Sequence, residues 1–133
     1  MIKKIDHIAI AVKNLGEAVG AWYNLFGLLP DEIENVPNQK VRVAIIQVGK
    51  LKIEIMEPTD PESPIAKFLD KRGEGLHNIA FKVKNVDKEL KHLSELKVEL
   101  IDRKGREGLA GKIGFLHPKS ANGVLVELVQ NEN

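Results

Sequence analysis

The sequence predicts an α+β fold built from two copies of one βαβββ module. Three observations predict it: an internal repeat, strand-like alternation of apolar residues, and cap signatures in front of apolar helical stripes. Residues 6–15 return as residues 77–86, displaced by 71 positions, and five of the ten pairs are identical. One module alone is too thin to bury a core, so we expect two of them to form an eight-stranded curved sheet with helices outside and a central trough.

In the first module, Asn14 and Glu17 form an N-cap signature, and Gly27 is the expected stop of the helix that follows. Alternating apolar residues predict strands at residues 4–12, 28–36, 40–48 and 51–57. Ser63 followed by Pro64 predicts a short helix in the connector, which ends at Gly73.

In the second module, Asn85 is the expected cap of a helix with a leucine-rich stripe. Strands are expected at residues 76–83, 98–102, 112–117 and 124–130, and residues 103–111, which contain three glycines, are expected to form a mobile loop. We expect a single domain over residues 1–133, with module one at about 1–58, a connector at 59–75 and module two at about 76–133.

The composition argues against several classes of function. The chain has 133 residues, of which 43% are apolar and 29% charged, with a net charge of +1. This balance gives no reason to expect a nucleic-acid or membrane partner. No apolar run approaches the length of a membrane span. Cysteine is absent, which excludes disulfides and thiolate chemistry and favours a cytoplasmic location.

Strand alternation selects the polar residues of interest. Glu127 shares a face with apolar neighbours, so its carboxylate is expected to lose water at a free-energy cost; an outward-facing or salt-bridged glutamate is the alternative. The repeat makes Asn78 the counterpart of His7, and both share faces with alanines. His77 is then expected to face the helices, unless a bulge at Gly75 turns it inward.

Each histidine also has a purely structural interpretation, and for His7 taken alone this is the commoner case. His92 is expected at a solvent-exposed helix face, and His117 is expected to anchor a loop before Pro118. No phosphate-binding glycine loop, serine–histidine–aspartate set or dinucleotide fingerprint is present in the sequence.

The opening strand at residues 6–12, with its helix ending at Phe26-Gly27, resembles the vicinal oxygen chelate superfamily, which includes glyoxalase and the bleomycin resistance proteins. Within it, residues 63–69, 75–77, 115–119 and 123–128 are most similar to the methylmalonyl-CoA epimerases. The resemblance implies the paired βαβββ fold and a homodimer.

The resemblance also implies a divalent metal (Co²⁺, Mn²⁺ or Zn²⁺) in the trough, with one ligand from each of four strands. The matching ligands are His7, Glu54, Asn78 and Glu127. Asn78 departs from the family pattern, which has a second histidine at this position, and His77 is the alternative ligand. A set richer in oxygen favours harder ions such as Mn²⁺ or Mg²⁺.

The implied reaction is epimerisation of methylmalonyl-CoA through proton removal at C2 and a metal-stabilised enolate. The resemblance implies Glu127 and Glu54 as the catalytic acids and bases, which double as metal ligands as the matching positions do in glyoxalase-like members. The strand at residues 40–48 is a second departure from the family pattern, because it lacks the acid that some epimerases carry there. Lys112, Lys119 and Arg103 are candidate contacts for the coenzyme A tail. The alternatives are a glyoxalase-like lyase or isomerase acting on another small thiol adduct, and a metal-free ligand-sequestering protein.

Overall fold

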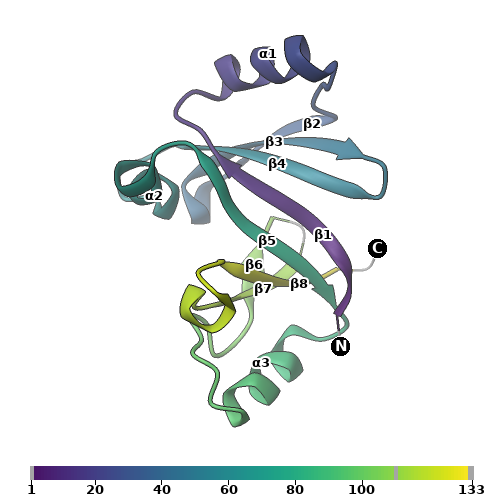
Figure 1. Ribbon diagram of the computed structural model, residues 1–133, viewed down its shortest axis with the longest axis vertical. Coiled ribbons are helices and arrows are strands. Elements are labelled where there is room, and N and C mark those ends of the chain that lie inside the picture. Colours follow the sequence, from purple (N-terminus) through teal and green to yellow (C-terminus); the bar gives the residue numbers. More distant parts are fainter. Residues whose placement is uncertain (1, 110, 132–133) are drawn as a thin grey trace. The chain divides into compact units, whose positions relative to one another are not determined.

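The computed structural model describes residues 2–109 and 111–131, and it confirms the α+β fold class (Figure 1). Its strands are β1 (Ile2–Ala11), β2 (Glu32–Val36), β3 (Val41–Val48), β4 (Leu51–Pro58), β5 (Gly75–Val83), β6 (Arg106–Gly108), β7 (Gly111–Leu116) and β8 (Val126–Gln130). Its helices are α1 (Leu15–Phe26), α2 (Pro64–Arg72) and α3 (Val86–Glu95), with 3-10 turns at Pro37–Gln39 and Pro118–Ala121.

The strand order shows the internal repeat directly. The eight described strands follow the order β2-β3-β4-β1-β5-β8-β7-β6. Read inward from the two ends, the order is β2-β3-β4-β1 for the first module and β6-β7-β8-β5 for the second, so each strand has a counterpart at the same place in its own module. The repeat in the sequence therefore corresponds to a repeat in topology.

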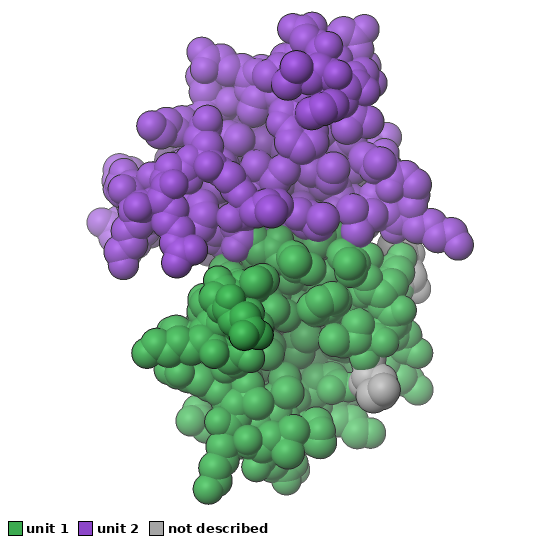
Figure 2. All heavy atoms as spheres, in the orientation of Figure 1, with its two compact units in different colours: residues 1–7, 78–133 green, residues 8–77 purple. Residues whose placement is uncertain are grey.

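The chain divides into two compact units (Figure 2). One unit contains Ile8–His77, and the other contains Met1–His7 together with Asn78–Asn133. The divisions fall after His7 and after His77, which are equivalent places in the repeat to within one residue. The first residues of β1 therefore belong to the unit that holds most of the second module. The domain limits expected from the sequence stay a prediction.

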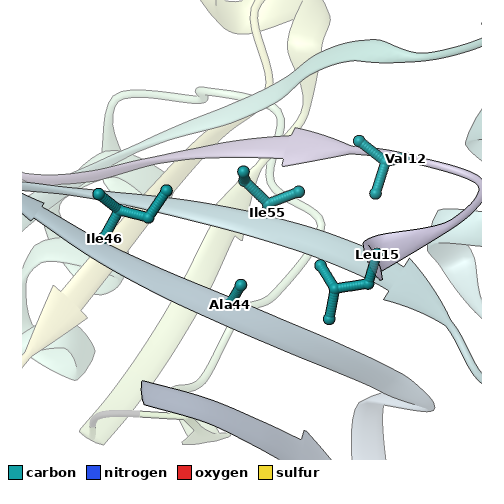
Figure 3. Close-up of a cluster of buried hydrophobic side chains, with 5 residues drawn as sticks. All are labelled: Val12, Leu15, Ala44, Ile46 and Ile55. Atoms are coloured by element: carbon teal, nitrogen blue, oxygen red, sulfur yellow. The ribbon is translucent and has the colours of Figure 1, made fainter. Parts of the chain in front are cut away.

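The core of the unit formed by residues 8–77 lies between α1 and the β3–β4 pair. Figure 3 shows its buried side chains, which are Val12, Leu15, Ala44, Ile46 and Ile55. A backbone hydrogen bond from the Val12 N–H to the Met56 carbonyl (2.9 Å) connects the end of β1 to β4. Burial of the valine, leucine and isoleucine side chains, each contributing roughly 1.5–3 kcal/mol, stabilises the unit.

The other unit has apolar clusters on both faces of its strands. On one face, Val86 and Leu90 of α3 pack against strand residues such as Val126 and Leu128. On the other face, Ala80, Ile113 and Val129 form a second buried cluster, with Phe115 packed against it. Both faces of β8 are thus buried, which is why its residues Val126–Val129 are all shielded from water.

The predicted helix limits are confirmed. Asn14 Oδ1 accepts a hydrogen bond from the Glu17 N–H (2.9 Å), and Asn85 Oδ1 does the same for the Lys88 N–H (3.0 Å). Ser63 Oγ accepts from the Ile65 N–H (3.1 Å) at the start of α2. Gly27 ends α1 with a φ of 69°, a left-handed conformation that glycine adopts without steric cost.

The strand expected at residues 98–102 is wrong. This segment forms an isolated bridge with β7, between Leu100 and Leu116, in place of a ladder. The N–H groups of Ile101 and Asp102 both donate to the carbonyl of Phe115 (3.0 and 3.1 Å), and the Asp102 carboxylate accepts from the Phe115 N–H (2.9 Å). Because a side chain takes the place of a backbone partner, a regular ladder cannot continue.

The edge strand is instead β6, which lies inside the segment expected to be a mobile loop. Its three residues pair with β7 in an antiparallel register that includes Arg106 opposite Ile113. Residue 110 of the expected loop lies outside the described residues. Two other strands begin later than expected, β2 at Glu32 and β8 at Val126. Among the described helices, none has the length and apolar character needed to cross a membrane.

We predict that Leu90→Ala destabilises the protein by about 2–5 kcal/mol, because Leu90 is fully buried between α3 and the sheet and its truncation leaves a cavity. Urea denaturation followed by circular dichroism measures the change. His92→Ala, on the exposed side of the same helix, is the matched control and should change the free energy of unfolding by less than about 0.5 kcal/mol. Equal effects of the two substitutions would contradict the packing assigned to α3.

Candidate active site

Glu127 is buried in the middle of β8. Only 6% of its surface is exposed, which confirms the expected loss of water and excludes the outward-facing alternative. The register places Ala80 of β5 and Phe115 of β7 on either side of it. Its carboxylate therefore sits within an apolar surface, where an unpaired charge would be very costly.

Two polar side chains approach this carboxylate within the same unit. Asn78, which is 3% exposed, donates a hydrogen bond from Nδ2 to Glu127 Oε1 (3.0 Å). His7, which is 4% exposed, places Nε2 3.5 Å from the same oxygen. The structure thus brings together three of the residues selected from the sequence, one from each of β1, β5 and β8.

The sequence analysis missed two further members of this cluster. The Asp6 carboxylate, also buried, lies 2.8 Å from His7 Nδ1. Asn131, just after β8, donates from Nδ2 to Asp6 Oδ1 (3.3 Å). Alternation assigns Asp6 and His7 to opposite faces of a strand, so the pattern gave no reason to pair them. The direct adjacency of an acid to a candidate histidine was the one available signal.

One separation in this cluster can be compared with the distance between two ligands of one metal ion. Two atoms that bind one Zn²⁺-like ion at about 2.0–2.2 Å lie about 3.3–3.6 Å apart when the ligands are tetrahedral. The separation of 3.5 Å between His7 Nε2 and Glu127 Oε1 agrees with this. Among the described residues, no group of three or more histidine, cysteine or acidic residues has an arrangement suited to a metal ion.

Glu54 lies on β4 in the other unit. It is 4% exposed, and its register partner on β3 is Ile45. A carboxylate at this depth is retained in proteins when it is paired or bound to a cation. Its grouping with His7, Asn78 and Glu127 stays a prediction.

His77 and Asn78 point in different directions, as alternation predicts. The His77 ring packs edge-on against Phe68 of α2, with ring centroids 4.9 Å apart. Asn78 instead bonds to Glu127. The expectation that His77 faces a helix is therefore confirmed, and the neighbouring amide is the group that lies in the cluster.

The basic residues expected near the substrate have other surroundings. Lys112 Nζ pairs with Asp87 Oδ2 of α3 (2.7 Å), on the face of β7 opposite Ile113. The Lys119 N–H donates to His117 Nδ1 (3.1 Å), which confirms that His117 anchors a turn. Lys119 and Arg103 are exposed at the surface. His92 is exposed as expected.

Arg106 is a basic residue on the same face as Glu127. Its guanidinium lies 5.4 Å from the centroid of the Phe115 ring, and Phe115 is the register partner of Glu127. Asp102 Oδ1 accepts a hydrogen bond from Arg106 Nε (3.2 Å). Residue Arg106 was not selected from the sequence because it was assigned to a loop rather than to a strand.

A family model for the glyoxalase/bleomycin resistance protein/dioxygenase superfamily matches residues 6–117. The chain belongs to this superfamily. The match confirms the resemblance found in the opening strand and helix. It also covers His7, Glu54 and Asn78.

Relatives of this superfamily member include named epimerases. The uncharacterized protein YqjC of Bacillus subtilis is 44% identical over 130 residues, which cover 97% of this chain and 93% of that protein. The mitochondrial methylmalonyl-CoA epimerase of Homo sapiens is 36% identical, with coverage of 96% and 73%. A variant of the Streptomyces coelicolor methylmalonyl-CoA epimerase, in complex with 2-nitronate-propionyl-CoA, is 34% identical with a TM-score of 0.92 and coverage of 98% and 96%.

The Lys112–Asp87 pair makes a testable contribution to acid stability. The hydrogen bond from Lys112, with a second from the Gly105 N–H, lowers the pKa of Asp87 below its ordinary value of 3.8. A lowered folded-state pKa adds stability that is present above the unfolded-state value and is lost as the pH falls through the folded-state value. We predict that Lys112→Met reduces the difference in urea midpoint between pH 6 and pH 2.5.

The matched control is Lys91→Met, on the exposed surface of α3. It should leave the pH dependence as it is in the unmodified protein. An unchanged pH dependence in Lys112→Met would show that Asp87 does not respond to this lysine in solution.

Proposed function

We propose that this protein is a methylmalonyl-CoA epimerase that uses Glu127 as a catalytic base. The observation that carries the proposal is the buried Glu127 carboxylate, with Asn78 Nδ2 at 3.0 Å and His7 Nε2 at 3.5 Å from one of its oxygens. A carboxylate with little water around it, held by a neighbouring amide, is typical of a general base rather than of a surface acid.

The similarity to epimerases supports the choice of substrate. The human and Streptomyces coelicolor relatives are named for action on methylmalonyl-CoA, and the second is seen with an acyl-CoA analogue. The similarity to the Streptomyces coelicolor enzyme covers 98% of this chain and 96% of that chain. An acyl-CoA is therefore the ligand class that the proposal assigns to this chain.

The chemistry requires removal of the proton at C2, between a thioester and a carboxylate, to give an enolate. Glu127 accepts this proton on one face of C2, and an acid on the other face returns it. The Asn78 N–H on Oε1 fixes how the Glu127 carboxylate is turned. The surrounding apolar residues Ala80, Val129 and Phe115 exclude water, which protects the carbanion from unselective protonation.

The second acid or base assigned by the proposal is Glu54. It is a buried carboxylate on the strand that corresponds to β8 in the first module. Strand β3 carries no acidic residue that could take this role.

A divalent ion belongs to the proposal, with His7, Asn78, Glu127 and Glu54 as the residues that would hold it. Such an ion supplies positive charge that stabilises the negative charge developing on the substrate oxygens. The donor set offers one imidazole nitrogen and otherwise oxygens, which favours harder ions such as Mn²⁺ or Mg²⁺. Of the ions that the family resemblance implies, Co²⁺, Mn²⁺ and Zn²⁺, this preference selects Mn²⁺. A cytoplasmic location and a homodimer stay further predictions of the same proposal.

We predict that the protein exchanges the C2 proton of methylmalonyl-CoA for deuterium in D₂O when Mn²⁺ or Co²⁺ is present, and that Glu127→Gln slows this exchange by at least about 100-fold, because the amide cannot accept the proton. Mass spectrometry of the recovered thioester measures the exchange. Glu95→Gln, an exposed residue at the end of α3, is the control and should leave the rate unchanged. Exchange that stays at background in the unmodified protein would contradict the epimerase proposal and favour a ligand-sequestering protein.

We predict that Asn78→His binds Mn²⁺ or Co²⁺ more tightly than the unmodified protein, because an imidazole nitrogen replaces a neutral amide beside Glu127. Isothermal titration calorimetry measures the affinity. The control is Asn35→His on the exposed face of β2, which should leave the affinity unchanged. Equal affinities of Asn78→His and the unmodified protein would remove Asn78 from the ligand set.

A further inference from the structure

We propose that Arg106 binds the free carboxylate on the acyl group of the substrate and makes the site selective for thioesters that carry one. This inference deepens the proposed function and rests on its assignment of Glu127 as the base at C2. It adds a substrate-binding residue that the sequence pattern assigned to a loop. The position, the anchoring and the charge of Arg106 carry the argument.

Arg106 lies on the face of the sheet that carries Glu127. It pairs in register with Ile113 of β7. Phe115, two residues further along β7 and therefore on the same face, is the register partner of Glu127. The guanidinium carbon of Arg106 lies 5.4 Å from the centroid of the Phe115 ring. The Arg106 cation and the Glu127 carboxylate are therefore neighbours of the same aromatic ring.

Two contacts fix the direction of the guanidinium. The Phe115 ring lies against it, and Asp102 Oδ1 accepts a hydrogen bond from Arg106 Nε (3.2 Å). Asp102 is itself held in place, because its Oδ2 accepts from the Phe115 N–H (2.9 Å). A guanidinium bonded at Nε still presents the edge with both Nη groups, which can bind a carboxylate through two parallel hydrogen bonds. The Arg106 side chain is 47% exposed, so a ligand can reach this edge from solvent.

The charges on this face explain why a cation is useful there. The free carboxylate of methylmalonyl-CoA is bonded to C2 itself, so it must come close to Glu127, which is ionised when it acts as a base. Two anions repel each other, and the repulsion is stronger in apolar surroundings than in water. An arginine side chain stays protonated in proteins, so Arg106 supplies the positive charge that offsets this repulsion.

The phosphates of coenzyme A are the other anions of such a substrate. They lie at the far end of the pantetheine arm, many bonds away from C2. When C2 is at Glu127, the anion that can reach a cation beside Phe115 is therefore the carboxylate.

Lys82 of β5 is a second basic residue on this face, because its register partner is Val129. Its ammonium is a point charge on a flexible stem, whereas Asp102 and Phe115 already orient the fork of Arg106. A fork oriented before binding loses less side-chain freedom when the ligand arrives. Arg106 is therefore assigned to the carboxylate, and Lys82 is the competing candidate.

The test compares two thioesters that differ by one carboxylate, methylmalonyl-CoA and propionyl-CoA. Isothermal titration calorimetry at one fixed Mn²⁺ concentration measures both affinities. We expect the unmodified protein to bind methylmalonyl-CoA at least about 10-fold more tightly than propionyl-CoA. Arg106→Gln should weaken the binding of methylmalonyl-CoA by about 10–100-fold and that of propionyl-CoA by less than about 2-fold. Arg106→Lys keeps the charge without the fork and should recover part of the loss.

Two controls separate carboxylate binding from a structural role. Arg72→Gln, at an exposed arginine of α2, should change neither affinity. Because exposed ion pairs contribute little to stability, Arg106→Gln should melt close to the temperature of the unmodified protein when followed by circular dichroism. An equal loss of affinity for both thioesters in Arg106→Gln would assign this residue to the fold or to coenzyme A and would overturn the inference.

Lys82→Met tests the competing candidate and should keep the preference for methylmalonyl-CoA. Loss of the preference in Lys82→Met, with the preference intact in Arg106→Gln, would overturn the inference and assign the carboxylate to Lys82. An unmodified protein that binds both thioesters equally well, or neither, would overturn it without any variant. Absence of C2 exchange would instead contradict the proposed function, because calorimetry measures the preference whether or not the thioester reacts.

Discussion

The burial of the Glu127 carboxylate is the constraint on which the candidate site depends. An isolated buried carboxylate costs several kcal/mol, and its neighbours in register, Ala80 and Phe115, offer no polar group. The compensation comes from the next polar positions on β1 and β5, where His7 and Asn78 reach the same oxygen. His7, Asn78 and Glu127 therefore depend on one another. Removal of His7 or Asn78 would leave the buried Glu127 carboxylate with less compensation for the water it has lost.

A second carboxylate makes His7 chemically asymmetric. Asp6 at Nδ1 and Glu127 at Nε2 give the ring one short contact and one long contact. The two ring nitrogens therefore have different surroundings, unlike those of an isolated imidazole in water. Such a difference matters for proton transfer and for metal binding, because each uses one particular nitrogen of the ring. The same geometry therefore serves an acid–base site and a metal site.

The repeat places polar residues at matching positions of the two modules. Strands β4 and β8 occupy the same place in their modules, and each carries a buried glutamate, Glu54 and Glu127. Strands β1 and β5 carry His7 and Asn78 at equivalent positions. The two copies have kept polar groups at matching places while changing their chemistry, a histidine in one and an amide in the other. In the proposed ligand set, that difference replaces an imidazole nitrogen with an amide oxygen and so makes the set richer in oxygen.

The sequence by itself determined the elements whose signals are local. The caps at Asn14 and Asn85 act over three residues, and alternation along one strand separates His77 from Asn78, so both features could be predicted. The tertiary structure decided what depends on residues far apart in the chain. The contact between Asp6 and Asn131 joins residues 125 positions apart, and the Asp102 carboxylate accepts a hydrogen bond from the Phe115 N–H where a backbone ladder was expected. Such choices are made by competition between side-chain and backbone partners that meet only when the chain has folded, and no short-range pattern records them.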